Sequence, residues 1–158
     1  MNYKVGDTVV HWSYGLGEIT NVEEKVIHGR LKQCYVVRAS KMTIWIPIDD
    51  SQQHTLRTPV SPDEFTGLFD ILSGPAQSLP QDRGLRRDFL MSQLQDGQLE
   101  SICKVVRDLT NLKRKSKLND QEKTILERAS NSLLTEWIFS LKVPLNQAQL
   151  AMTRLLEG

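Results

Sequence analysis

The chain has 158 residues, of which 39% are hydrophobic and 25% are charged, a balance typical of a folded globular protein. No apolar run approaches the roughly 20 residues that a membrane-spanning helix needs, and the first residues contain no apolar signal core. We therefore expect a cytoplasmic protein without a membrane partner. Residues 1–82 carry 7 Lys or Arg against 10 Asp or Glu, whereas residues 83–158 carry 13 against 9. This asymmetry behind a net charge of +1 indicates two surfaces with different partners.

The first 60 residues have the pattern of short β-strands. Gly15 and Gly17 predict a tight turn or bulge, where a side chain would obstruct a close backbone contact. Runs of β-branched and aromatic residues predict strands at 22–27, 32–38 and 42–48, with a hairpin turn at 28–30. Short strands at this spacing predict a small barrel or a strongly bent sheet.

The pattern becomes helical near residue 61. Ser61, Pro62 and Glu64 have the spacing of an N-cap, a first helical residue and a capping partner, which predicts a helix start. Residues 74–82 combine Gly, Pro and polar residues, and they predict a linker.

From residue 83 onward, apolar residues recur at helical spacing and predict a compact bundle. Asn119 and Glu122 have the spacing of another capped helix start, and Trp137 falls in the apolar stripe that follows, so we expect it in the core. The predicted fold class is α+β. It comprises a β domain over 1–60, a connecting helix and linker over 61–82, and an all-helical domain over 83–158.

No set of residues predicts a catalytic or metal site. His11, His28 and His54 lack metal-ligand spacing and belong to no recognisable nucleophile motif, so we interpret each as a surface or packing histidine. Asp49 and Asp50 could bind a cation, although a solvated turn is the commoner outcome. The two cysteines are far apart in sequence, and we expect both to be free and buried. We therefore expect no enzyme, no metal and no cofactor.

Trp45 is a candidate for binding another protein. If Ile44 and Ile46 face the core, the two-residue period of a strand places Thr43 and Trp45 on the outer face. An exposed Trp on a sheet is a good interface anchor. In the alternative, both faces of the strand are covered and Trp45 belongs to the core, and the sequence favours neither reading.

Basic residues gather in the helical half. Arg83, Arg86 and Arg87 share a face at the start of a predicted helix, and a second basic stretch contains Lys113 and Arg114. Because positive charge at a helix start opposes the helix dipole, the first group favours a negatively charged partner. Such residues would bind DNA phosphates without sequence preference and in a salt-sensitive manner. A solvated basic face is the commoner role of such a run.

Seven segments carry a pattern that we associate with one family. They are KVGDTVV at 4–10, YGLG at 14–17, MTIWIPID at 42–49, LR at 56–57, SPDE at 61–64, VVRDL at 105–109 and LNDQEK at 118–123. In this order and spacing, they resemble the CarD/CdnL proteins, which are bacterial transcription regulators. The module over the first segments also occurs as the polymerase-interacting domain of transcription-repair coupling factors. Since the resemblance covers nearly the whole chain, it favours the full-length regulator over the isolated module.

The resemblance implies a Tudor-like N-terminal domain that docks on the β subunit of RNA polymerase. It also implies a helical domain that contacts promoter DNA at the upstream edge of the transcription bubble, where a Trp inserts into the minor groove. Such a protein would stabilise the open complex because it binds the melted state more tightly. The expected protein is a non-enzymatic, cytoplasmic, nucleoid-associated monomer.

The family's polymerase-contacting positions fall on Lys25 and Trp45, with Thr43 beside them on the same strand face. Family members often have Arg at both positions. Lys25 keeps the charge without the forked geometry of Arg, and Trp45 replaces a charge with an aromatic anchor.

Arg83 stands at the position where the family has its inserted Trp, and the sequence has no Trp between residues 46 and 136. Leu85 is a shorter candidate for the same role. Arg86 keeps a neighbouring basic position, and Asp88 stands where a Lys is common. The resemblance thus implies DNA contacts at Arg83, Leu85, Arg86 and Arg87, with weaker or altered stabilisation of the bubble edge.

Three functions compete at this point. The first connects polymerase through the front domain to promoter DNA through the back domain. The second is a polymerase-binding adapter with little or no DNA contact, which the missing Trp and Asp88 favour. The third, a cryptic hydrolase or metal enzyme, lacks a visible constellation of catalytic residues.

Overall fold

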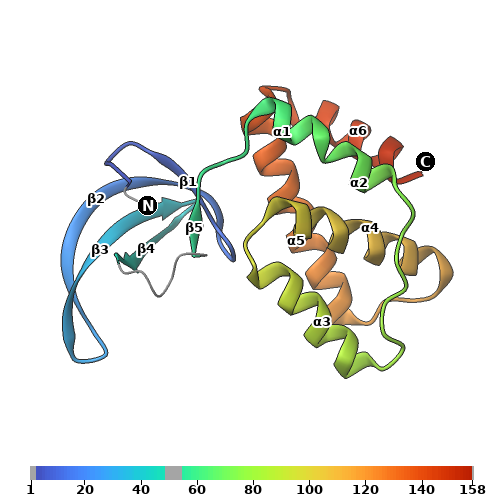
Figure 1. Cartoon of the computed structure of the whole chain (residues 1–158), viewed down its shortest axis with the longest axis horizontal. Helices are drawn as coiled ribbons and strands as arrows, with labels where there is room; N and C mark the ends of the chain where they lie inside the picture. The colour runs from blue at the N-terminus through green and yellow to red at the C-terminus, as the bar shows by residue number, and fades with distance from the viewer. Residues whose placement is uncertain (1–2, 49–54, 158) are drawn as a thin grey trace. The chain divides into compact units, whose positions relative to one another are not determined.

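A computed structural model describes residues 3–48 and 55–157 of the chain. The chain divides into two compact units, Met1–Pro59 and Val60–Gly158. The first unit contains an antiparallel sheet and the second contains helices (Figure 1), so the predicted α+β fold class is confirmed. In the described residues, no helix is long and apolar enough to cross a membrane.

Five strands form the sheet of the first unit in the order β4-β3-β2-β1-β5. They are β1 (Thr8–His11), β2 (Gly15–Ile27), β3 (Arg30–Ala39), β4 (Met42–Pro47) and β5 (Leu56–Arg57). The predicted hairpin turn is confirmed between β2 and β3, where His28 and Gly29 adopt positive φ angles of 52° and 77°. A register shift interrupts the pairing of β2 with β3 between Ile19 and Asn21. Figure 1 shows both strands strongly bent. The Tudor-like character of this domain stays a prediction.

The core of the sheet lies on one face, where alternate residues of neighbouring strands meet. Its buried members are Val9, Ile19, Tyr35, Val37, Ile46 and Leu56. Gly17 allows β2 to approach β3 at the edge of this core, because a Cβ there would lie 2.9 Å from the carbonyl oxygen of Arg38. The sequence prediction of a close backbone contact at Gly17 is thus confirmed. Gly15 follows the turn between β1 and β2 with a φ of 81°.

The second unit contains six helices in its described part. They are α1 (Pro62–Gly67), α2 (Phe69–Ser73), α3 (Arg83–Gln95), α4 (Leu99–Lys115), α5 (Asp120–Leu141) and α6 (Leu145–Glu157). The predicted caps are confirmed, since the side chains of Ser61 and Asn119 accept hydrogen bonds from the backbone N–H groups of Glu64 and Glu122. The side chain of Asp82 caps α3 in the same way.

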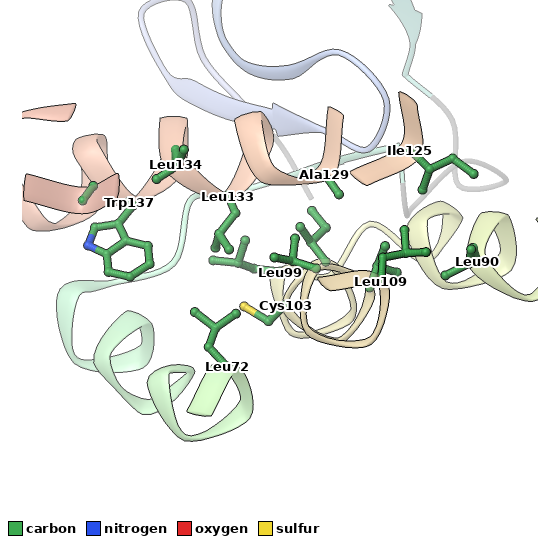
Figure 2. Packing of buried hydrophobic residues seen from close by; sticks show 14 of the residues in the cluster. Leu72, Leu90, Leu99, Cys103, Leu109, Ile125, Ala129, Leu133, Leu134 and Trp137 are labelled. Carbon is green, nitrogen blue, oxygen red and sulfur yellow. The ribbon is translucent and has the colours of Figure 1, made fainter. Parts of the chain in front are cut away.

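Helix α4 is central to the second unit, because it contacts α2, α3 and α5. Figure 2 shows its buried side of Leu99, Cys103 and Leu109 facing residues of α5. Trp137 is buried in this core, as predicted. Phe65 and Leu72 also belong to the core, so α1 and α2 pack as part of the helical unit although we expected residues 61–82 to connect two domains.

Buried carboxylates of the helices hold the irregular segments of this unit. Asp108 on α4 accepts the backbone N–H of Gln77 at 3.0 Å. Glu136 on α5 accepts the N–H of Val60 at 2.9 Å, and the Ser140 hydroxyl donates to the carbonyl of Val60 at 2.9 Å. Because each bond is made to backbone, the path of these segments is fixed by the helices on which they lie.

Replacement of Gly17 by Ala tests the close approach of β2 and β3. The added methyl group would also lie 2.9 Å from a side-chain carbon of Val37, and the backbone oxygen of Arg38 cannot rotate away. We expect the free energy of unfolding to fall by about 1–3 kcal/mol. Urea denaturation followed by circular dichroism measures this change. Gly67→Ala is the control, because a Cβ at Gly67 meets nothing within 4 Å; equal stability of the two variants would contradict the prediction.

Candidate functional site

One candidate surface lies on the outer face of the sheet. The register pairs Val36 with Trp45 and Cys34 with Glu23, so Trp45 and Glu23 project from the same side of the sheet. The indole Nε1 of Trp45 donates a hydrogen bond of 2.7 Å to Glu23 Oε1. The Nζ of Lys25 lies 3.5 Å from the centre of the Trp45 ring. We call this group, together with exposed Thr43, the Trp45 surface.

Trp45 lies on the face of the sheet opposite the apolar core, to which Ile46 points. The ring is half-buried and Lys25 covers it, and its neighbours Cys34 and Val36 are buried on the same face. The outer-face interpretation is therefore right about the direction of the side chain, but this face is partly covered. The cation–π contact holds the Lys25 ammonium against the ring, so the pair presents an aromatic plane and a positive charge together. All three residues that we expected to contact polymerase thus lie on this face.

The second candidate surface is the start of α3, which we call the α3 surface: Arg83, Leu85 and Arg87. All three side chains are exposed, and Leu85 is exposed by 62% although it is apolar. Arg87 Nη2 lies 3.4 Å from Asp88 Oδ1, with both side chains at least half exposed. Such a contact contributes little to stability, and it leaves the guanidinium accessible.

Arg86 lies apart from this surface, although the sequence pattern placed it on the same face. Its side chain is only 14% exposed, and its Nη1 lies 2.6 Å from Glu122 Oε2. Its other nitrogens donate to the carbonyls of Pro80 at 2.9 Å and Gln81 at 3.3 Å. The guanidinium is therefore occupied inside the helical unit, where it holds the start of α3 against the start of α5.

Glu122 has two roles at the start of α5. Its Oε1 accepts the backbone N–H of Asn119, which completes a capping box, and its Oε2 pairs with Arg86. Burial raises the pKa of Glu122, but the hydrogen bonds from Arg86 and the Asn119 backbone outweigh it and hold the pKa below its ordinary value. The ionised carboxylate is thus the form that the fold stabilises.

The basic end of α4 is a third exposed region. Lys113 and Arg114 lie in its last turn, where positive charge complements the helix dipole. Both side chains are exposed. Within the described residues, neither side chain forms an ion pair.

The histidines and cysteines are the side chains on which metal binding or nucleophilic chemistry would depend. No group of three or more His, Cys, Asp or Glu side chains among them could hold a metal ion. His11 is a packing histidine, since its Nδ1 accepts the backbone N–H groups of Ser13 and Tyr14. Both cysteines are free and buried, as expected, and burial raises the pKa of the Cys103 thiol to about 12. His28 is exposed, whereas His54 and the Asp49–Asp50 pair fall outside the described residues.

Comparison with known proteins assigns both units. The model of the CarD-like/TRCF RID domain matches residues 3–60, and that of the CarD C-terminal domain matches residues 67–153. The chain belongs to the CarD family. A Bacillus subtilis (strain 168) protein named "Putative transcription factor YdeB" is 31% identical over 140 residues, which cover 85% of this chain and 89% of that protein.

Members of the CarD family are transcription factors and not enzymes. The match of the first unit to a polymerase-interacting domain indicates RNA polymerase as its partner. The structure also gives physical reasons for two segments of the family pattern. In VVRDL, Asp108 holds Gln77, and in LNDQEK, Asn119 and Glu122 cap α5.

Sequence reasoning missed the buried carboxylates of Asp108 and Glu136, and it predicted Glu122 as a capping residue but not as the partner of Arg86. A signal was present for Asp108, because an acidic residue between Val105, Val106 and Leu109 interrupts an apolar stripe. An acidic residue in that position predicts a buried carboxylate with donors nearby. The identity of those donors, such as Gln77, depends on the tertiary fold.

Replacement of Arg86 by Ala tests its structural role. The change leaves the Glu122 carboxylate, which is 5% exposed, without its cation, and we expect a loss of about 3–5 kcal/mol in unfolding free energy at neutral pH. The pair stabilises the fold above the ordinary Glu pKa of 4.5, and this contribution is lost as the pH falls below it. The variant should therefore lose less stability on acidification than the wild-type chain. Urea titrations at several pH values measure both effects.

Arg87→Ala is the matched control for this experiment. It removes the same charge one residue away, from a pair whose side chains are 50% and 70% exposed. We expect its unfolding free energy to stay within about 0.5 kcal/mol of wild type. Similar losses in both variants would show that Arg86 has no special structural role.

Proposed function

We propose that this transcription factor binds the β subunit of RNA polymerase through the Trp45 surface and contacts promoter DNA through the α3 surface. In this role it stabilises the open complex at the upstream edge of the bubble. The protein would act in the bacterial cytoplasm, at the nucleoid, as a monomer. The observation that carries the DNA half of the proposal is the exposed apolar Leu85 between two exposed arginines at a helix start.

The chemistry of the α3 surface suits a DNA backbone and an open base step. Arg83 and Arg87 add positive charge to the positive end of the α3 dipole, which favours phosphate. Leu85 lies between them, and apolar side chains of its kind insert between base steps in minor-groove binders. Phe89, which is 40% exposed one turn later, extends the apolar strip. Lys113 and Arg114 are proposed as further phosphate contacts because both are exposed cations.

The chemistry of the Trp45 surface suits a protein partner. Burial of an aromatic ring supplies much of the energy of a typical interface, and Trp is among the residues that contribute most. Lys25 and Glu23 already contact the ring, so its orientation is set before binding. Little side-chain entropy remains to be lost on docking, which favours affinity.

The adapter without DNA contact remains the second candidate, and one observation favours it. Asp88 is 70% exposed beside Arg87, so it places negative charge close to the proposed phosphate contacts. In addition, Arg86 is occupied by Glu122 and cannot add to the positive charge of this surface.

Replacement of Trp45 by Ala tests polymerase binding. Loss of the ring removes the proposed anchor, and we expect the affinity for the cognate polymerase to fall by about tenfold or more. Biolayer interferometry with immobilised polymerase measures the affinity. Val22→Ala is the control, because Val22 is an exposed residue that pairs with Tyr35 and projects from the opposite face of the sheet. If Val22→Ala weakens binding as much as Trp45→Ala, the polymerase does not use the Trp45 surface.

Reversal of both arginines, Arg83→Glu with Arg87→Glu, tests DNA contact. We expect the wild-type chain to lengthen the lifetime of the open complex, and the double variant to lose most of this effect at saturating protein. Removal of two phosphate contacts should also make DNA binding less sensitive to salt. The slope of log affinity against log salt concentration should become less steep by roughly 0.9 for each contact removed. Promoter-dissociation kinetics with a competitor measure the lifetime.

Arg154→Glu serves as the control, because it reverses an exposed charge on α6. The proposal requires that this variant keep the wild-type lifetime. If the double variant also keeps it while polymerase binding is intact, the adapter is the correct function.

A further inference from the structure

A groove lies where the end of α4 meets the start of α5, and Lys113 is the one lining residue that the proposed DNA contacts include. It has a volume of about 630 Å³. Its lining consists of Lys113, Ser116, Lys117, Leu118, Lys123, Leu126, Glu127 and Ser130. This volume falls within the range of about 300–1,000 Å³ that ligand clefts occupy.

The groove combines apolar side chains with a positively charged lining. Half-buried Leu126 supplies accessible apolar surface to the lining, whereas Leu118 is 3% exposed and belongs to the helical core. Lys113, Lys117 and Lys123 face a single carboxylate, that of Glu127. The groove therefore offers an apolar contact and an excess of positive charge in the same place.

The fold uses one of these three positive charges, that of Lys113, which complements the dipole at the end of α4. Lys123 lies at the end of the first turn of α5, where the helix dipole disfavours a cation. Glu127 is four residues further on, a spacing that allows an ion pair on a helix. Yet within residues 55–157, neither Lys117 nor Lys123 forms an ion pair. Two exposed cations beside the same groove, neither of them in an ion pair, favour a partner that supplies the negative charge.

We propose that this groove binds a short segment of another polypeptide in which an apolar side chain is flanked by Asp or Glu. The apolar residue would pack mainly on Leu126, and the flanking carboxylates would pair with Lys117 and Lys123. A nucleic-acid backbone fits less well, because phosphates alone leave the accessible side of Leu126 without an apolar contact. This interaction goes beyond the proposed polymerase and DNA contacts and does not depend on them.

The test uses fluorescence anisotropy with the full chain and a labelled peptide of glutamates interrupted by leucines at helical spacing. A second peptide carries serine in place of each leucine. We expect the leucine peptide to bind and the serine peptide to bind much more weakly. Lys117→Glu and Lys123→Glu should each weaken binding of the leucine peptide by roughly tenfold, whereas Glu127→Gln should strengthen it.

Lys115→Glu is the matched control. Lys115 is an exposed cation on the last turn of α4 that does not line the groove, so the proposal requires unchanged affinity. Circular dichroism and polymerase binding confirm that each variant is folded. These variants leave Trp45, Arg83 and Arg87 intact, so the outcome is independent of the polymerase and open-complex experiments.

Three outcomes would overturn the proposal. Equal binding of the two peptides would show that the apolar lining of the groove has no role. An equal loss of affinity for the leucine peptide in Lys115→Glu would show that any nearby cation is sufficient for binding. Failure of the leucine peptide to bind, together with weaker binding of duplex DNA by Lys123→Glu, would assign the groove to nucleic acid.

Discussion

The ion pair between Arg86 and Glu122 determines where the exposed part of α3 lies in the helical unit. Arg86 joins three elements, because it donates to the carboxylate at the start of α5 and to two carbonyls of the segment that precedes α3. The bond to Glu122 therefore joins the first turns of α3 and α5, two helices that are labelled in Figure 1. Since Arg83, Leu85 and Arg87 surround Arg86 on the first turns of α3, the buried arginine orients the exposed ones.

Two further carboxylates act in the same way. Asp108 fixes the segment after α2 through Gln77, and Glu136 fixes the start of the unit through Val60. Burial of a charge costs free energy, and the cost is tolerated where strong hydrogen bonds satisfy the group. Asp108 meets this condition, because it also accepts a bond of 2.8 Å from Arg107 Nε. The apolar core between the helices supplies burial, while these carboxylates determine the path of the connecting chain.

The sequence predicted those features that depend on local spacing. The caps at Ser61 and Asn119 follow from side chains that reach a backbone N–H three residues away, and the structure has both. The buried position of Trp137 follows from helical periodicity. The approach of β2 to β3 at Gly17 follows from the missing side chain. Each of these predictions needed no knowledge of distant parts of the chain.

The division among the arginines of α3 could not be predicted in this way. Spacing places Arg83, Arg86 and Arg87 on one broad face, but only Arg86 meets Glu122, which is 36 residues away in sequence. Periodicity gives the direction of a side chain from its own helix and gives nothing about a neighbouring helix. The contact of Lys25 with Trp45 is similar, because it joins β2 to β4 across β3. Side chains that meet through the tertiary fold therefore required the structure.

The start of α5 connects the α3 surface with the groove. Consecutive residues of a helix point about 100° apart, so Glu122 and Lys123 face different surroundings. Glu122 is buried against Arg86, whereas Lys123 is exposed and lines the groove. A partner that pairs with Lys123 would thus bind one residue away from the carboxylate that holds α3. Two consecutive residues of one helical turn thus belong to two different surfaces, Glu122 by positioning α3 and Lys123 by lining the groove.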